Sequence, residues 1–182
     1  GRDGLLPAVG QQPAAPRPQG GVRHHVALSV VGTDRLQQSG YFRAKQAQDR
    51  VVSAGGIPYT IVQTTQFFEF VDGIARSAGD GPVLRLSSAW VQPISSDDVA
   101  AAMYDAALAP PVNGVVEIAG PDRFQLDQLV GRFLRAKGDQ REVMGDSAVP
   151  YFGAVLEPGT LVPAGQARLG AVHFDSWLSG PA

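Results

Sequence analysis

The feature that most constrains the fold is an alternation of apolar, β-rich runs with a helical stripe early in the chain. His25–Val31 reads HVALSVV, which is typical of a strand buried in a parallel sheet. Residues 40–54 follow, with apolar side chains at steps of three and four that predict a helix. Gly55-Gly56 favours the end of that helix, and Pro58–Val62 reads as a second strand. The order strand, helix, strand predicts an α/β fold with a parallel sheet.

The same alternation continues along the chain. Four Ser and Asp residues before residue 99 are candidate N-caps for the helix that follows them. Beyond Arg141 the pattern weakens, and Gly and Pro are frequent up to His173. The elements expected here are a helix over 66–78, short strands over 82–86 and 89–93, a helix over 99–108, a strand over 114–119 and a helix over 126–136.

Residues 1–21 differ from the rest of the chain. They contain four Pro and five Gly and little apolar periodicity. Pro removes backbone donors and Gly favours the unfolded chain, so a flexible tail is expected here. The folded part is then expected to span 22–182, enough for one domain with a real core.

Composition excludes several classes of protein. The net charge is −2 with no basic block, so nucleic-acid binding is not indicated. The chain has no Cys, which excludes disulfides and thiolate zinc sites. No apolar stretch approaches the roughly 20 residues that span a bilayer, so no membrane partner is expected. The N-terminus lacks a signal-peptide pattern, and a cytoplasmic location is expected.

Three residues in the first strand and helix suggest chemistry. Tyr41 and Lys45 lie four residues apart, on one face of the predicted helix, and Ser29 lies near the end of the preceding strand. A nearby ammonium favours the phenolate and lowers a Tyr pKa, and a Ser hydroxyl can hydrogen-bond a carbonyl oxygen as charge develops on it. Tyr-x-x-x-Lys is also common by chance, and a Tyr ring packed on a Lys stem explains the spacing equally well.

A longer resemblance adds weight to the catalytic interpretation. The run HHVALSVVGTDRLQQSGYFRAKQAQDRVVSAGGIPYTIVQTTQFFEF, from His24 to Phe70, resembles the NmrA-like, NAD(P)-binding group of atypical short-chain dehydrogenase/reductases. The resemblance continues through VQPISSDDVAAAM and VVEIAGPDRFQLDQLV, and covers about residues 22–136 well. It implies a partial Rossmann-like parallel sheet flanked by helices, with a small C-terminal substrate lobe at about 137–182.

The resemblance also implies roles for the three residues. Ser29 matches the strand serine that contacts substrate or nicotinamide, and Tyr41 matches the tyrosine that acts as acid and base. Lys45 matches the lysine that holds the nicotinamide ribose and lowers the tyrosine pKa. A chain of this kind moves a hydride between a nicotinamide and a carbonyl, imine or quinone-like group of a small molecule.

Residues after the second strand match the loop that lines the nicotinamide pocket. They are Thr64, Thr65 and Phe67, although this loop more often reads Arg-Pro or Arg-Ala where this chain has Gln63-Thr64. Asp98 matches the acid that opens the next helix, where a capping role is expected.

One part of the family pattern does not occur. Relatives begin with about 100 residues of βαβαβ that carry a Gly-rich loop for the dinucleotide phosphates, and no such loop is found in these 182 residues. A truncated chain is therefore expected, with weak binding of NAD or NADP. Removing half of such a sheet exposes an edge strand, which predicts self-association. Two alternatives are a non-catalytic NAD(P)-sensing regulator and an inactive fragment.

Other candidate sites have plainer explanations. His24-His25 precede a strand without companion metal ligands, so a solvent or strand-edge role is favoured over a metal site. Phe67, Phe68 and Phe70 have the spacing of core residues rather than of a base-stacking surface. The cations near the end of the helix over 126–136 are expected to be solvated there.

Overall fold

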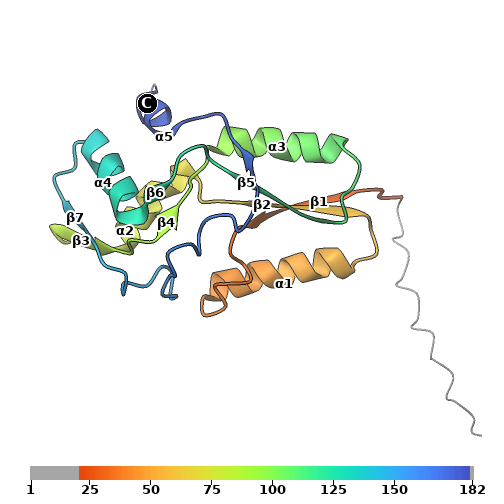
Figure 1. The fold of residues 1–182 in the computed structure, drawn as a ribbon, viewed down its shortest axis with the longest axis horizontal. Coiled ribbons are helices and arrows are strands. Elements are labelled where there is room, and N and C mark those ends of the chain that lie inside the picture. The colour runs from red at the N-terminus through yellow and green to blue at the C-terminus, as the bar shows by residue number, and fades with distance from the viewer. Residues whose placement is uncertain (1–20, 181–182) are drawn as a thin grey trace, which may run out of the picture.

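A computed structural model describes residues 21–180, so the tail predicted for 1–21 lies almost wholly outside the described residues. The centre is a parallel sheet of four strands in the order β1-β2-β5-β8. This confirms the expected α/β class with a Rossmann-like parallel sheet and helices beside it (Figure 1). The strands are β1 (His25–Val30), β2 (Tyr59–Thr64), β5 (Gly114–Ala119) and β8 (Arg168–Leu169).

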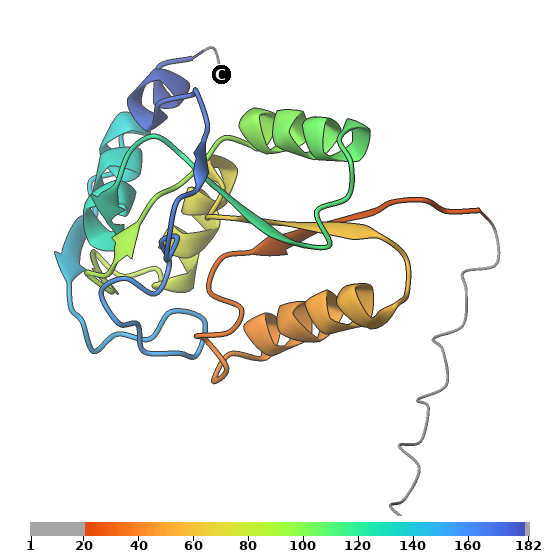
Figure 2. The ribbon, with the colours of Figure 1, turned by 45° about the vertical axis from the view of Figure 1, so that its right-hand side comes forward.

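Two helices cover opposite faces of this sheet. Helix α1 (Gly40–Ala54) packs on the face that carries Ala27 and Ile61, and helix α3 (Ser96–Leu108) packs on the face that carries Val62 (Figures 1 and 2). Side chains alternate across a strand, so apolar residues at neighbouring positions supply both faces. Strand β2, between β1 and β5, is therefore buried on both faces, as its apolar run predicts.

A second group of elements packs beyond the carboxyl ends of the sheet strands, around the largest apolar core (Figure 2). Strand β7 pairs in parallel with β3, so this group combines segments from before and after residue 137. The role of the C-terminal part as a substrate lobe stays a prediction. The elements are η1 (Phe68–Phe70), α2 (Val71–Ser77), β3 (Val83–Leu86), β4 (Trp90–Val91), β6 (Phe124–Gln125), α4 (Leu126–Ala136), β7 (Glu142–Gly145) and α5 (Phe174–Leu178).

The helix expected over 66–78 begins later than its apolar pattern suggested. Ile94 holds the start of this segment extended, because its N–H donates to the Gln66 carbonyl and its carbonyl accepts from Phe68 N–H, both at 2.9 Å. Helical structure starts only at Phe68. Phe70, expected in the core, is 46% exposed, so the assignment of all three phenylalanines to the core was wrong for this residue.

Asp98 accepts a hydrogen bond that attaches the C-terminal segment to helix α3, and it is not the N-cap of this helix. The cap is Ser95, whose Oγ accepts from Asp98 N–H at 3.1 Å. The Asp98 carboxylate in turn accepts from Val172 N–H at 3.0 Å. Burial opposes ionisation of Asp98, but backbone hydrogen bonds from Val172 and Ala171, with the Ser95 side chain and the charge of Arg168, together outweigh it and lower the pKa of this carboxyl.

We expect Asp98→Ala to lower the free energy of unfolding by about 1 kcal/mol at pH 7, since a charged but partly solvated hydrogen bond is lost. The folded-state pKa lies below its ordinary value of 3.8, so this stabilisation is present above that value and disappears as the pH falls through the folded pKa. Urea melts of parent and variant at pH 7 and at about pH 3 measure the difference. Asp97→Ala, an exposed neighbour in the same turn, is the matched control; an equal loss in both variants would contradict the assignment.

Strand β1 is an edge of the main sheet in the part of the chain that the structure describes. Leu28, in the middle of this strand, is an exposed apolar side chain. Self-association through this edge stays a prediction. Among residues 21–180, no helix has the length and apolar character needed to cross a membrane.

Candidate functional site

A cavity of about 410 Å³ lies where β1 and β2 end, beside the first turns of α1. Its size falls in the range of small-molecule sites, and functional groups collect at the carboxyl ends of strands in this class of fold. All six residues singled out from the sequence line it, although their roles stay predictions. The predicted residues are Ser29, Tyr41, Lys45, Thr64, Thr65 and Phe67, and the others are Leu28, Val30, Phe42, Gln66, Phe70, Tyr151 and Phe152.

Tyr41 stands at the mouth of this cavity, in the first turn of α1. Its side chain is 57% exposed, and its ring meets Phe42 edge to face with centroids 5.2 Å apart. Partial burial of the phenol raises the pKa of Tyr41. This direction is opposite to the lowering expected from Lys45, so the phenol is neutral at physiological pH.

Lys45 is held by other partners than Tyr41. Its Nζ donates to the Leu28 carbonyl oxygen and to Gln48 Oε1, both at 2.8 Å. Gln48 Nε2 also donates to the Leu28 carbonyl, at 3.0 Å. The ammonium therefore satisfies the backbone of the edge strand and stays at the cavity wall, where Lys45 is one of the lining residues.

Ser29 donates its hydroxyl proton to a carboxylate. The acceptor is Asp49 Oδ2, at 2.9 Å, and Gln63 Nε2 donates to the same oxygen at 3.0 Å. The other oxygen, Asp49 Oδ1, is buried and has no hydrogen-bond partner within the described residues. Asp49 lies four residues after Lys45, on the face of α1 that meets the sheet. With its proton engaged by Asp49, the Ser29 hydroxyl has only lone pairs left for a further hydrogen bond, in which it can be the acceptor.

The loop after β2 is fixed by the backbone that surrounds it. Thr64 accepts from Val31 N–H at 2.9 Å, and Thr65 N–H donates to the Ile118 carbonyl at 3.2 Å. The Thr65 hydroxyl donates to the Gln92 carbonyl at 2.5 Å. These bonds make the two threonines a rigid part of the wall and engage the Thr65 hydroxyl proton.

Three further lining residues were not singled out from the sequence. Gln66 is only 7% exposed, yet neither its amide nitrogen nor its amide oxygen has a partner among the described residues. Tyr151 and Phe152 come from the C-terminal segment, more than 80 residues beyond the rest of the site in the chain. Phe152 stacks on Phe70, with centroids 5.8 Å apart and planes at 26°.

A tight turn carries these two aromatic residues. Tyr151 N–H donates to the Ala154 carbonyl at 2.7 Å, and Ala154 N–H donates back to Tyr151 at 3.1 Å. Phe152 and Gly153 fill the centre with φ of 45° and 85°. Two successive positive φ values are the signature of a type I′ turn, and a bulky residue such as Phe at the first position is strained.

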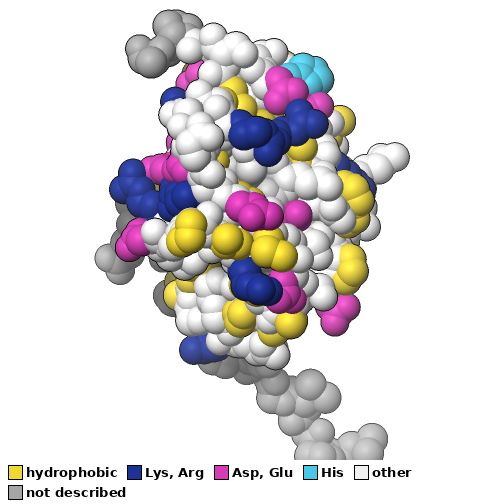
Figure 3. Space-filling model, turned by 90° about the vertical axis from the view of Figure 1, so that its left-hand side faces the viewer, with side chains coloured by type: hydrophobic (Ala, Val, Ile, Leu, Met, Phe, Trp, Pro, Cys, Tyr) yellow, Lys and Arg dark blue, Asp and Glu magenta, His cyan; other side chains and the backbone are white. Residues whose placement is uncertain are grey.

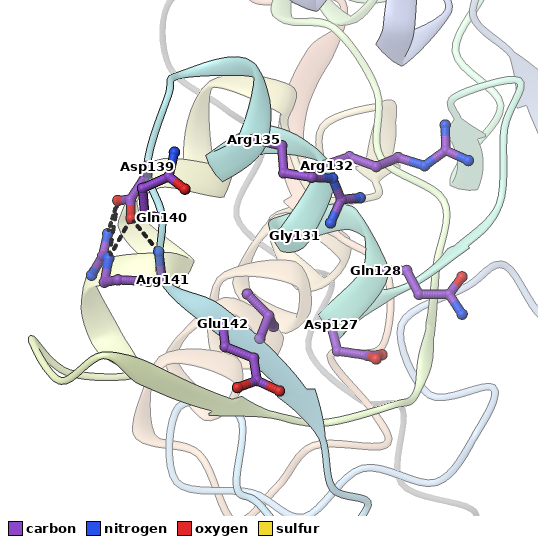
Figure 4. Close-up of a pocket in the computed structure, with 10 residues that line it drawn as sticks. Asp127, Gln128, Gly131, Arg132, Arg135, Asp139, Gln140, Arg141 and Glu142 are labelled. Atoms are coloured by element: carbon purple, nitrogen blue, oxygen red, sulfur yellow. Dashed lines mark hydrogen bonds and ion pairs between the residues drawn. The ribbon is translucent and has the colours of Figure 1, made fainter.

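A second hollow, of about 580 Å³, lies between α4 and β7 (Figure 4). Two of its arginines pair within the protein, Arg141 with Asp139 at 2.7 Å and Arg132 with Asp175 at 3.0 Å. Figure 3 shows basic and acidic side chains mixed with apolar ones on this side of the molecule. The hollow therefore has the character of a solvated helix surface, as the sequence suggested for these cations.

Metal-binding side chains do not gather anywhere in residues 21–180: no three His, Cys, Asp or Glu lie together. His24, which precedes β1, has its Nε2 2.9 Å from Thr60 Oγ1 of the neighbouring strand.

No family model matches the chain, and no curated protein matches it. Several solved structures match it in fold. An NADPH-dependent quinone oxidoreductase from Escherichia coli is 18% identical, with a TM-score of 0.61 over 87% of this chain and 67% of that one. A nucleoside-diphosphate-sugar epimerase from Staphylococcus aureus is 15% identical, with a TM-score of 0.62 over 89% and 66%. UDP-glucose 4-epimerase from Thermus thermophilus, in complex with NAD, is 14% identical, with a TM-score of 0.53 over 78% and 57%.

These likenesses establish the fold, that of NAD(P)-binding reductases and epimerases. At these identities they establish no activity. The chain spans about two thirds of the length of the first two of these structures and somewhat more than half of the third.

We expect Gly153→Ala to destabilise the fold by about 1 kcal/mol, because a φ of 85° strains any residue with a Cβ. No neighbouring atom lies within 4 Å of the added methyl, so the loss reports backbone strain alone. Gly159→Ala, in the same segment but outside the left-handed region, is the control and is expected to be neutral or slightly stabilising. Thermal melts measure both; equal effects would show that the turn does not require its glycine.

Proposed function

We propose that this chain carries the substrate side of an NAD(P)-dependent oxidoreductase that reduces a carbonyl, imine or quinone-like group of a small molecule. The proposal rests on one observation: Ser29, Tyr41 and Lys45 line the same cavity as the loop after β2. The fold shared with NAD(P)-binding reductases and epimerases supports it.

The cavity suits the nicotinamide half of the cofactor. Its wall combines apolar side chains with Ser29 lone pairs, the Lys45 ammonium and a buried Gln66 amide that lacks a protein partner. A carboxamide and a ribose need partners of these kinds. The cofactor would supply a hydride. Since the sequence has no Gly-rich phosphate loop, we propose that this chain alone binds NADH or NADPH weakly.

Tyr41 is the proposed proton donor. In a reduction, the substrate oxygen gains a proton as its carbon gains hydride, so the phenol has to start in its neutral form. The raised pKa of Tyr41 keeps it in this form. Lys45 is proposed to meet the ribose, in exchange for one of its present bonds to Leu28 or Gln48.

We expect Tyr41→Phe to reduce turnover by at least about 100-fold while leaving cofactor affinity nearly unchanged, since only the proton-donating hydroxyl is lost. Lys45→Ala should weaken both turnover and cofactor binding. Steady-state rates with millimolar NADPH and a titration by nucleotide fluorescence separate the two effects. Tyr104→Phe, on the exposed surface of α3, is the control for loss of a hydroxyl; full activity in Tyr41→Phe would refute the assignment.

Reductive turnover should depend little on pH between about 6 and 9. The pKa of Tyr41 is raised above its ordinary value of 10.0, so the donor form persists over this range and is lost only as the pH rises through this raised pKa. A profile of kcat against pH checks this. A fall centred near pH 7 to 8 would instead indicate a phenol activated by the lysine.

A non-catalytic NAD(P) sensor is the alternative. One observation favours it: Lys45 is engaged by Leu28 and Gln48 rather than by Tyr41. A sensor would bind the cofactor without turnover of any quinone or carbonyl, and its behaviour would be unchanged in Tyr41→Phe.

A further inference from the structure

Two hydroxyl protons at the cavity wall are engaged within the protein. A substrate oxygen that develops negative charge needs donors aimed at it. Ser29 gives its proton to Asp49 at 2.9 Å, and Thr65 gives its proton to Gln92 at 2.5 Å. Both donors are therefore already used within the protein. Among the residues that line the cavity, Tyr41, Tyr151 and the largely buried Thr64 carry hydroxyls for which the structure shows no such partner.

Tyr151 is the less obvious of the two tyrosines. Its side chain is 6% exposed and lines the cavity. The structure shows no acceptor for its hydroxyl within the described residues, and its oxygen is not among the fully enclosed polar atoms that lack a partner, so it keeps some accessible surface. Burial is the main cause that raises the pKa of Tyr151, and the nearby Tyr41 raises it further. The hydroxyl therefore stays protonated and able to donate at any physiological pH.

The position of Tyr151 is well fixed. Its backbone is closed on Ala154 by two hydrogen bonds, and its ring meets Phe152 edge to face with centroids 4.7 Å apart. Phe152 in turn stacks on Phe70 at the rim. A preorganised donor loses little freedom when it binds a ligand, which is the condition for a large contribution in a reaction site.

We propose that Tyr151 is a second substrate-binding donor: its hydroxyl holds the substrate oxygen beside Tyr41, while Ser29 serves this site as an acceptor. Tyr151 donates a hydrogen bond and transfers no proton, so the proton that the oxygen gains comes from Tyr41. This proposal rests on the proposed oxidoreductase function. It differs from the role that the family resemblance implies, in which the strand serine contacts the substrate.

The test compares Tyr151→Phe with Ser29→Ala, using 9,10-phenanthrenequinone as the probe and millimolar NADPH. Tyr151→Phe keeps the ring and is expected to lower kcat/KM by about 10- to 100-fold and to weaken binding of the quinone alone, measured by calorimetry, by at least threefold. Its pH profile should match that of the parent, because Tyr41 still supplies the proton. Ser29→Ala should lose less kcat/KM than Tyr151→Phe. Tyr104→Phe is the control.

The outcomes separate the two proposals. If the parent is active and Tyr151→Phe keeps the parental kcat/KM and quinone affinity, the role of Tyr151 is overturned and the oxidoreductase function stands. The same conclusion follows if the parent is active and Ser29→Ala loses more kcat/KM than Tyr151→Phe. A parent that binds the quinone through Tyr151 but does not reduce it refutes the function and keeps the binding role. A parent that neither binds nor reduces the quinone overturns both. Melting temperatures of the variants, compared with the parent, identify a loss caused by unfolding.

Discussion

The parallel register of β1 and β2 is the constraint on which the site depends. Ser29 lies opposite Gln63 and Val30 opposite Thr64, so both strands end at the same level. Hydrogen bonds from Val31 to Thr64 and from Thr65 to Ile118 extend this alignment past the strands into β5. A shift of one residue would turn Ser29 away from Asp49 and toward the α3 face of the sheet. The cavity at this edge is thus a consequence of strand pairing.

The polar groups at that edge differ in how far the protein already satisfies them. Lys45, Ser29 and Thr65 each donate to a protein oxygen, at 2.8, 2.9 and 2.5 Å. Such groups shape a site, because using them on a ligand means exchanging one hydrogen bond for another of similar strength. Neither amide atom of Gln66 has such a partner among the described residues, and the Tyr151 hydroxyl, whose oxygen is not fully enclosed, makes no hydrogen bond there. New bonds to a ligand there satisfy groups that are otherwise unpaired, so these residues are where binding energy can be gained.

Local pattern was enough to predict most of the fold. The helix over 40–54, the strand over 114–119 and the helix over 126–136 agree with the structure to within a residue, because each has a clear period and a clear end signal. The apolar pattern fails only at the start of the segment 66–78, since pairing with Ile94 overrides the helical pattern there. The six predicted residues share one cavity because strand ends and the first turns of a following helix meet in any such fold.

The part of the cavity that could not be predicted from the sequence is the wall that tertiary contacts bring in from the C-terminal segment. Asp49 had a usable signal, since it continues the four-residue spacing of Tyr41 and Lys45. Tyr151 and Phe152 had none, because a short aromatic turn in a Gly- and Pro-rich segment does not indicate which distant surface it covers. That surface is set by tertiary bonds: Arg35, after β1, donates to the carbonyls of Gly159 and Val162, both at 3.1 Å, and holds the segment over the strand ends. With the segment fixed there, the packing of Phe152 on Phe70 can offset its unfavourable φ, and the strained turn is retained where it lines the cavity.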